Sequence, residues 1–134
     1  MDKQDTKVLV VDDHSSLRSC ISAILGLEGY SNIRLANDGM QALEMADDYR
    51  PHVVVMDTSM PRMDGITACK ELRAREYGNN MAIIGMSLGN EFGHKRTAYL
   101  DAGADDFIDK SDLADLGSHM LDDVIQRNLA KYQA

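Results

Sequence analysis

Acidic residues follow two apolar runs of this 134-residue chain, and their side chains could bind a metal ion together. Asp12 and Asp13 come directly after residues 8–11, and Asp57 comes directly after residues 53–56. In an open parallel sheet, ligands bind outside the carboxyl ends of the strands, so neighbouring strands would bring these carboxylates into one pocket. Anions this close repel each other unless a cation or protons intervene. A small, open set of oxygen ligands favours Mg²⁺ over Ca²⁺, which prefers a cage of many ligands.

A hydroxyl group and an ammonium group are expected at the same edge of the sheet. Ser87 follows the apolar run 81–86, and Lys110 follows residues 107–109. Together they could hold the oxygens of a phosphoryl group on a carboxylate, which is the positioning and charge neutralisation that phosphoryl transfer requires. Lys110 could instead form only a salt bridge to the acidic residues. Either of the two N-terminal aspartates alone could simply cap the helix that follows.

Strand and helix patterns alternate five times along the chain, which predicts an α/β fold with a parallel sheet covered on both faces by helices. The continuous apolar runs 8–11, 53–56 and 81–86 are typical of central strands that are buried on both sides. The weaker runs 33–36 and 107–108 are predicted as outer strands.

Apolar periodicity and capping residues place the helices. The first is predicted from the residues Leu17, Cys20, Ile21, Ile24 and Leu25, with an end near Gly29. The second is expected to start after Asn37 and Asp38, and the third after Asp64 and Gly65, because aspartate is a favoured N-cap. A fourth helix, starting at Glu91 and ending at Ala102, has a weak apolar stripe and should pack loosely. The last is expected from about Asp112 to the C-terminus.

Length and composition indicate one domain over residues 1–134. The net charge of -8 opposes direct binding to nucleic acid. No apolar run is long enough to insert into a membrane and no signal peptide is recognised, so a cytoplasmic location is expected. Cys20 and Cys69 both fall on predicted apolar stripes and are interpreted as two buried thiols.

In combination, these features resemble the receiver domain of two-component response regulators. The resemblance rests on Asp12 and Asp13, on residues 57–65, on Ser87 at a strand end and on residues 103–110. It extends from about Lys7 to about Val124. It implies a doubly wound (βα)5, flavodoxin-like three-layer sandwich whose five-stranded parallel sheet has the strand order 2-1-3-4-5.

The resemblance also implies the chemistry of the pocket. Asp57 would accept the phosphoryl group from a phosphohistidine or from a small donor such as acetyl phosphate, and Lys110 would pair with the phosphoryl oxygens. Asp13, Asp57 and the backbone carbonyl of Ser59 would ligate Mg²⁺, and Asp12 would assist through water. The chain would not be an enzyme beyond catalysing its own phosphorylation and dephosphorylation.

A switch and two kinds of partner are implied as well. Ser87 would close onto the phosphate while Phe107 turns inward, unless Phe107 is a permanently buried core residue. The donor would be a sensor histidine kinase or a phosphotransfer protein. The downstream target would bind the helix between Glu91 and Ala102 and the strand face at Phe107.

Individual contact residues are also suggested by the family. Lys95, Arg96 and Tyr99 are candidates for output contacts, and Leu17 and Cys20 are candidates for kinase docking. Two alternatives remain: a receiver-fold scaffold that works without phosphorylation, and an aspartate-nucleophile phosphohydrolase. The second is disfavoured because such enzymes carry another acidic residue two positions after the nucleophile, where this chain has serine.

Two residues depart from the family pattern. Ser111 follows the pocket lysine where proline is usual, and it could cap the last helix together with Asp112. Leu88 follows Ser87 where a small residue is usual, and it should hinder the approach of water or of a phosphatase to the phosphoryl group. Leu88 is therefore expected to alter the rates of phosphotransfer or dephosphorylation.

Overall fold

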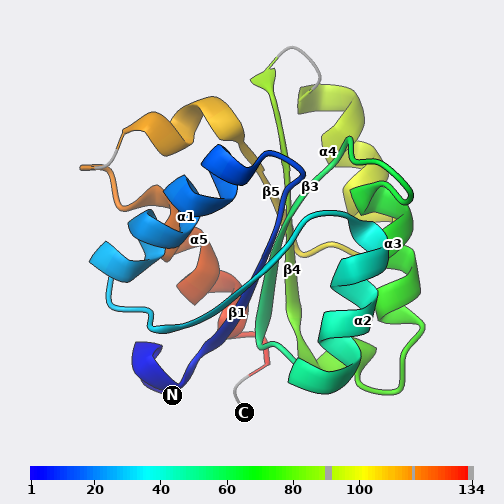
Figure 1. Cartoon of the computed structure of the whole chain (residues 1–134), viewed down its shortest axis with the longest axis horizontal. Helices are drawn as coiled ribbons and strands as arrows, with labels where there is room; N and C mark the ends of the chain where they lie inside the picture. The colour runs from blue at the N-terminus through cyan, green and yellow to red at the C-terminus, as the bar shows by residue number, and fades with distance from the viewer. Residues whose placement is uncertain (90–91, 116, 133–134) are drawn as a thin grey trace.

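The computed structural model describes residues 1–89, 92–115 and 117–132. Its centre is a five-stranded parallel sheet in the order β2-β1-β3-β4-β5, which confirms the predicted fold class (Figure 1). The strands are β1 (Lys7–Val11), β2 (Asn32–Ala36), β3 (Val53–Asp57), β4 (Ala82–Ser87) and β5 (Asp106–Asp109). Residues 33–36 and 107–108 lie in the two edge strands, as their weaker apolar character predicted.

Helices cover both faces of the sheet and complete the three-layer sandwich. They are α1 (Ser15–Leu27), α2 (Gly39–Tyr49), α3 (Gly65–Arg73), α4 (Phe92–Asp101) and α5 (Met120–Leu129). Helices α1 and α5 lie on one face, and α2, α3 and α4 lie on the other (Figure 1). Within the described ranges, no helix is long and apolar enough to cross a membrane.

The predicted start of the second helix after Asp38 is confirmed, and the third starts at Gly65, directly after its cap Asp64. The Asp38 side chain accepts a hydrogen bond from the backbone N–H of Gln41, and the Asp64 side chain accepts one from that of Thr67. Each carboxylate satisfies an N–H group that has no partner within its helix. The predicted end of α1 near Gly29 is also confirmed, since the backbone there has a φ of +103°.

The last helix starts later than predicted. Residues near Asp112 form a short 3-10 helix, η4 (Lys110–Ala114), and α5 begins only at Met120. The cap of η4 is Asp109, whose Oδ1 accepts hydrogen bonds from the backbone N–H and the hydroxyl of Ser111, at 3.0 and 2.8 Å. The prediction that Ser111 would itself cap the helix is therefore wrong. The apolar periodicity predicted one continuous helix because Leu113 is buried like a helical core residue. Leu113 belongs to η4, however, and the chain leaves helical geometry at Asp115.

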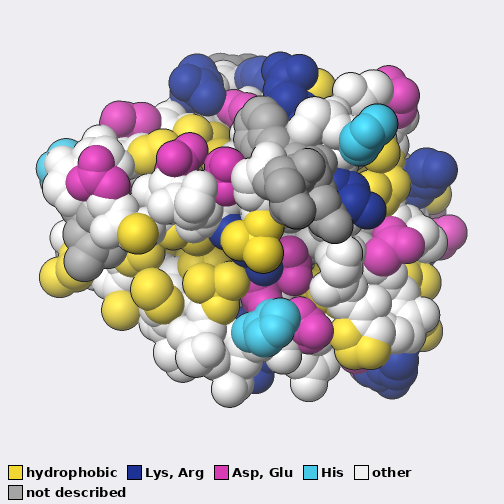
Figure 2. Space-filling model, turned by 90° about the horizontal axis from the view of Figure 1, so that it is seen from above, with side chains coloured by type: hydrophobic (Ala, Val, Ile, Leu, Met, Phe, Trp, Pro, Cys, Tyr) yellow, Lys and Arg dark blue, Asp and Glu magenta, His cyan; other side chains and the backbone are white. Residues whose placement is uncertain are grey.

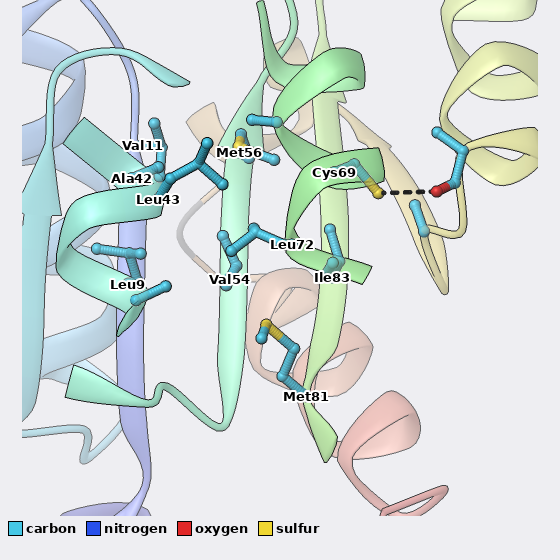
Figure 3. Packing of buried hydrophobic residues seen from close by; sticks show 14 of the residues in the cluster. Leu9, Val11, Ala42, Leu43, Val54, Met56, Cys69, Leu72, Met81 and Ile83 are labelled. Carbon is cyan, nitrogen blue, oxygen red and sulfur yellow. Dashed lines mark hydrogen bonds between the residues drawn. The ribbon is translucent and has the colours of Figure 1, made fainter. Parts of the chain in front are cut away.

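The two faces of the sheet carry separate apolar layers. On the face covered by α2 and α3, side chains from the helices interleave with those of β1, β3 and β4 (Figure 3). Cys69 belongs to this layer, and its thiol donates a weak hydrogen bond to the carbonyl oxygen of Ala102 at 3.6 Å. Burial raises the pKa of this thiol to about 11.

Cys20 is exposed, so the prediction of two buried thiols is wrong for this residue. The fully buried residues of α1 are Ile21 and Leu25. Cys20 precedes Ile21 by one position, which rotates its side chain by about 100° around the helix towards solvent. The apolar stripe of α1 is therefore narrower than predicted.

Arg73, at the end of α3, joins three segments of the chain through its guanidinium group. Its Nε donates to the carbonyl oxygen of Gly103 at 2.8 Å, and its Nη1 donates to the carbonyl oxygens of Gly78 and Met81 at 2.6 and 2.7 Å. Its Nη2 lies 2.9 Å from Oδ2 of Asp105. Both side chains of this ion pair are mostly buried, so the pair is a packed structural element rather than a surface contact.

Candidate functional site

The register of β1 against β3 brings the first acidic residues together. Val11 of β1 lies beside Met56 of β3. Asp12 and Asp57 are the next residues along these parallel neighbours, so both side chains lie at the carboxyl edge of the sheet. Asp12 is fully buried and Asp57 is 5% exposed. The carboxylates of Asp12 and Asp57 therefore lie at the same edge of the sheet, as predicted.

The register of the next two strands adds the hydroxyl and the ammonium. Asp57 lies beside Met86 of β4, and Ser87 lies beside Asp109 of β5. Ser87 therefore extends one residue beyond Asp57, and Lys110 follows one residue beyond Asp109. The strands β1, β3, β4 and β5 all contribute, because a polar residue ends or directly follows each of them.

Lys110 is the cation that balances the buried carboxylates. Its Nζ lies 2.9 Å from Oδ2 of Asp12 and 2.8 Å from Oδ1 of Asp57, and its side chain is 9% exposed. Oδ1 of Asp57 also accepts the backbone N–H of Thr58 at 2.8 Å. Burial raises the pKa of Asp57, an effect that its hydrogen bond with Lys110 opposes and the charge of Asp12 reinforces. Burial acts to lower the pKa of Lys110, but its bonds to the two carboxylates raise it overall.

Asp13 and His14 complete the acidic cluster. One ligand atom from each of Asp12, Asp13, His14 and Asp57 lies within 4.8 Å of the others. In the described part of the chain, the buried Oδ1 of Asp13 has no hydrogen bond, although His14 Nδ1 lies 3.1 Å away. A buried carboxylate oxygen without a hydrogen bond fits a cation ligand, and clustered carboxylate oxygens suit a hard divalent ion. The site therefore fits Mg²⁺.

A pocket opens above this cluster at the carboxyl edge of the sheet. It is lined by His14, Asp57, Thr58, Ser59, Ser87, Leu88 and Lys110. Figure 2 looks onto this edge, where acidic side chains and a histidine gather close together. Leu88 lies at the pocket with 60% of its surface exposed, in the position from which it was expected to hinder access. The Ser87 hydroxyl lies 3.4 Å from the carbonyl oxygen of Leu88.

The loop that follows Asp57 is fastened to the start of α2, which the sequence interpretation missed. Arg62 places Nε 2.8 Å from Oδ2 of Asp38 and Nη2 3.2 Å from its Oδ1. The backbone N–H of Gly39 donates to the carbonyl oxygen of Met63 at 3.1 Å. The hydrogen bond with Arg62 lowers the pKa of Asp38. These contacts hold the loop that carries Ser59, the expected carbonyl ligand.

Phe107 and Tyr99 lie behind the pocket. Phe107 is 5% exposed, and its ring centroid lies 5.6 Å from that of Tyr99. Phe107 is thus already buried, which agrees with the alternative interpretation that it is a core residue. Its motion on phosphorylation stays a prediction. Tyr99 is fully buried, so the prediction that it contacts an output partner is wrong. Arg96 is exposed and Lys95 is half-buried, so both remain candidates for such contacts.

Fold and site together define an α/β protein of the flavodoxin-like class with an acidic pocket suited to a divalent cation. The family model of the response regulator receiver domain matches residues 8–120. The chain therefore belongs to the receiver domain family of response regulators.

The relatives and structural neighbours agree with this family. Response regulator MprA of Mycobacterium leprae (strain TN) is 40% identical over 104 residues, which cover 78% of this chain and 44% of that protein. The receiver domain of sensor histidine kinase PA1611 from Pseudomonas aeruginosa PAO1, solved with magnesium in its active site cleft, has a TM-score of 0.80 and 31% identity, covering 93% of this chain and 98% of that one. Vibrio cholerae chemotaxis protein CheY4 has a TM-score of 0.79 and 28% identity, covering 92% and 98%.

Proposed function

We propose that this chain is a phospho-receiver that accepts a phosphoryl group on Asp57. The observation that carries the proposal is the arrangement of the Asp57 carboxylate. Among the described contacts, its hydrogen bonds and ion pair all engage Oδ1, while the residue lines an open pocket. Oδ2 is then the oxygen that can attack phosphorus, because its lone pairs are not shared with a donor. Lys110 lies at hydrogen-bonding distance from the same carboxylate.

The reaction moves one phosphoryl group and forms one P–O bond. Oδ2 of Asp57 attacks the phosphorus as the bond from phosphorus to the donor, a phosphohistidine nitrogen or the acetate oxygen of acetyl phosphate, breaks. Lys110 pairs with the phosphoryl oxygens, and the Ser87 hydroxyl donates to another of them. Asp13, Asp57 and the Ser59 carbonyl would hold Mg²⁺, with Asp12 assisting, and the bound ion would neutralise charge on the transferring group.

The biological setting belongs to the same proposal. Receiver domains of response regulators work with histidine kinases and downstream effectors. We expect the chain to work in the cytoplasm. We expect the donor to be a sensor histidine kinase or phosphotransfer protein, and the target to be a protein that binds α4 and the β5 edge. The only chemistry of the chain itself would be its own phosphorylation and dephosphorylation. Because the chain spans 44% of the relative MprA, the partners and output of the whole protein are part of the proposal.

Intact mass measurement tests the function. The protein is incubated with acetyl phosphate and Mg²⁺, with and without excess EDTA, and the adduct is mapped to a peptide. A phosphoryl adduct on the peptide that contains Asp57, absent with EDTA, is expected. No adduct with Mg²⁺ present would refute phosphoryl acceptance and favour a scaffold that works without phosphorylation. An adduct that survives EDTA would refute the metal requirement alone.

Leu88→Ala is expected to accelerate hydrolysis of the aspartyl phosphate. The leucine side chain lines the pocket, and its removal opens a path for water to the phosphoryl group. We expect a three- to tenfold shorter lifetime, corresponding to about 1 kcal/mol of barrier. The measurement follows loss of the adduct after the donor is removed. Leu27→Ala, at the exposed end of α1, serves as the matched control, and equal lifetimes for both variants would show that Leu88 does not guard the pocket.

A further inference from the structure

Tyr99 connects α4 to the backbone of the phosphoacceptor. Its hydroxyl oxygen lies 2.5 Å from the carbonyl oxygen of Asp57 and 3.1 Å from that of Met56. A hydroxyl carries one proton, so the shorter contact is the principal hydrogen bond. Among the described side chains of α4, Tyr99 is the one that is buried. Among the described residues of α4, Tyr99 is therefore the deepest contact with the sheet, and its far end touches Asp57.

Two glycines make room for the Tyr99 side chain. A Cβ atom at Gly85, inside β4, would lie 2.6 to 2.8 Å from atoms of the Tyr99 ring. A Cβ atom at Gly65, the first residue of α3, would overlap the Tyr99 hydroxyl. Glycine inside a buried strand often marks the close approach of another group. The position of Tyr99 is thus fixed by the sheet and by α3, and its hydroxyl has little freedom to turn elsewhere.

The ring of Tyr99 also contacts the residue that is expected to move in the switch. The Phe107 and Tyr99 rings are tilted by 47° with their centroids 5.6 Å apart, which is a favourable aromatic contact. Tyr99 therefore joins three groups: the backbone of α4, the carbonyl of Asp57 and the ring of Phe107. A shift at Asp57 or Phe107 must either move Tyr99 or break its hydrogen bond, because packed groups rearrange between discrete positions.

We infer that Tyr99 is a positioning residue that couples the state of Asp57 to the position of α4. The inference rests on the proposed function and deepens it by naming how the site regulates the helix. In the unphosphorylated protein, the hydrogen bond to the Asp57 carbonyl holds α4 in its resting position. Phosphorylation of the Asp57 side chain displaces its backbone and the packed rings, and Tyr99 transmits that displacement to α4.

Tyr99→Phe tests the inference because it removes the hydroxyl and keeps the ring. Beryllofluoride with Mg²⁺ replaces the phosphoryl group, ¹⁹F NMR measures its occupancy, and hydrogen exchange measures opening of the α4 amides. In the wild type, we expect the ligand to change α4 exchange. In Tyr99→Phe, we expect occupancy to persist, resting α4 amides to exchange about fivefold to tenfold faster, and the ligand-induced difference to disappear. A purely structural hydroxyl would shift exchange equally with and without ligand.

Tyr49→Phe is the matched control. Tyr49 is also buried, and its hydroxyl also donates to one residue, Asn32, whose side-chain and backbone carbonyl oxygens lie 2.7 and 2.8 Å away. This contact is at the start of β2 and away from the pocket. Its loss should leave the α4 response intact. An equal ligand response in wild type and Tyr99→Phe, or bound beryllofluoride without any response of wild-type α4, would overturn the inference. No bound beryllofluoride in the wild type would instead remove the proposed function on which the inference rests.

A measurement on the wild type covers the case in which Tyr99→Phe does not fold. Tyrosine labelled with ¹³C at the ring carbon that bears the hydroxyl reports each hydroxyl environment. Addition of beryllofluoride and Mg²⁺ should shift the Tyr99 resonance and leave that of Tyr49 in place. An unmoved Tyr99 resonance at full occupancy would contradict the coupling.

Discussion

No phosphoryl adduct is expected on the Asp57→Asn protein under conditions in which the wild type is labelled. The amide nitrogen has no lone pair available for attack, so replacement of the carboxylate removes the nucleophile while the size of the side chain stays the same. The amide oxygen can still accept from Lys110 and from the backbone N–H of Thr58, as Oδ1 of Asp57 does now. The loss should therefore be chemical rather than structural.

Thermal unfolding distinguishes loss of the nucleophile from loss of the folded structure. Burial raises the pKa of Asp57, so its ionised form opposes folding above its ordinary pKa, and a neutral amide should leave the melting temperature unchanged or higher. Asp48→Asn, on the exposed side of α2, is the control and should be labelled like the wild type. Labelling of Asp57→Asn at the wild-type rate would mean that another residue accepts the phosphoryl group.

Arg73→Ala is expected to reduce the free energy of unfolding by about 3–5 kcal/mol, the usual cost of removing one partner of a buried ion pair. The substitution leaves Asp105 without its buried cation and takes donors from the carbonyl groups of Gly78, Met81 and Gly103. For a domain of this size, the melting temperature should fall by roughly 10–20 °C. Chemical denaturation followed by circular dichroism measures the change.

Arg75→Ala is the matched control for Arg73. Arg75 is two residues further along and pairs with Asp47 at 3.2 Å and with Glu71 at 3.7 Å, at a more exposed position. Ion pairs of this kind contribute about 0–1 kcal/mol because water screens them. Arg73→Lys should recover little stability, since one ammonium cannot reproduce the planar set of guanidinium donors. Similar losses for Arg73→Ala and Arg75→Ala would refute the structural role of Arg73.

The strands and the edge at which the polar residues lie could be predicted because both depend on short-range sequence patterns, whereas the strand order came from the family resemblance. Each central strand is a continuous apolar run, and a polar residue at its end must lie at the carboxyl edge of a parallel sheet. This reasoning was sufficient to bring Asp12, Asp57, Ser87 and Lys110 to one edge of the sheet. His14 was missed, although its position directly after two acidic residues places it at the same edge.

The contacts that the sequence did not reveal join residues that are far apart and not apolar. Asp38 was recognised as a helix cap, but its ion pair with Arg62 depends on how two loops meet. Tyr99 was expected to contact an output partner by analogy with the family, and its hydrogen-bond partner is a backbone carbonyl, which carries no sequence signal. Glycine at position 85, within an apolar strand, was the available hint of a close approach.

The fit between Tyr99 and its two glycines also constrains how this protein can evolve. A side chain larger than hydrogen at Gly65 or Gly85 collides with Tyr99, so neither glycine can be replaced while the tyrosine stays in place. At Gly85 the reverse order is open, since a smaller residue at position 99 first removes the ring that a new side chain would meet. At Gly65 it is closed, because a Cβ atom there would also overlap the backbone carbonyl oxygen of Asp57. Positions 85 and 99 should therefore covary among descendants of this sequence, with the change at position 99 first, while glycine should persist at position 65.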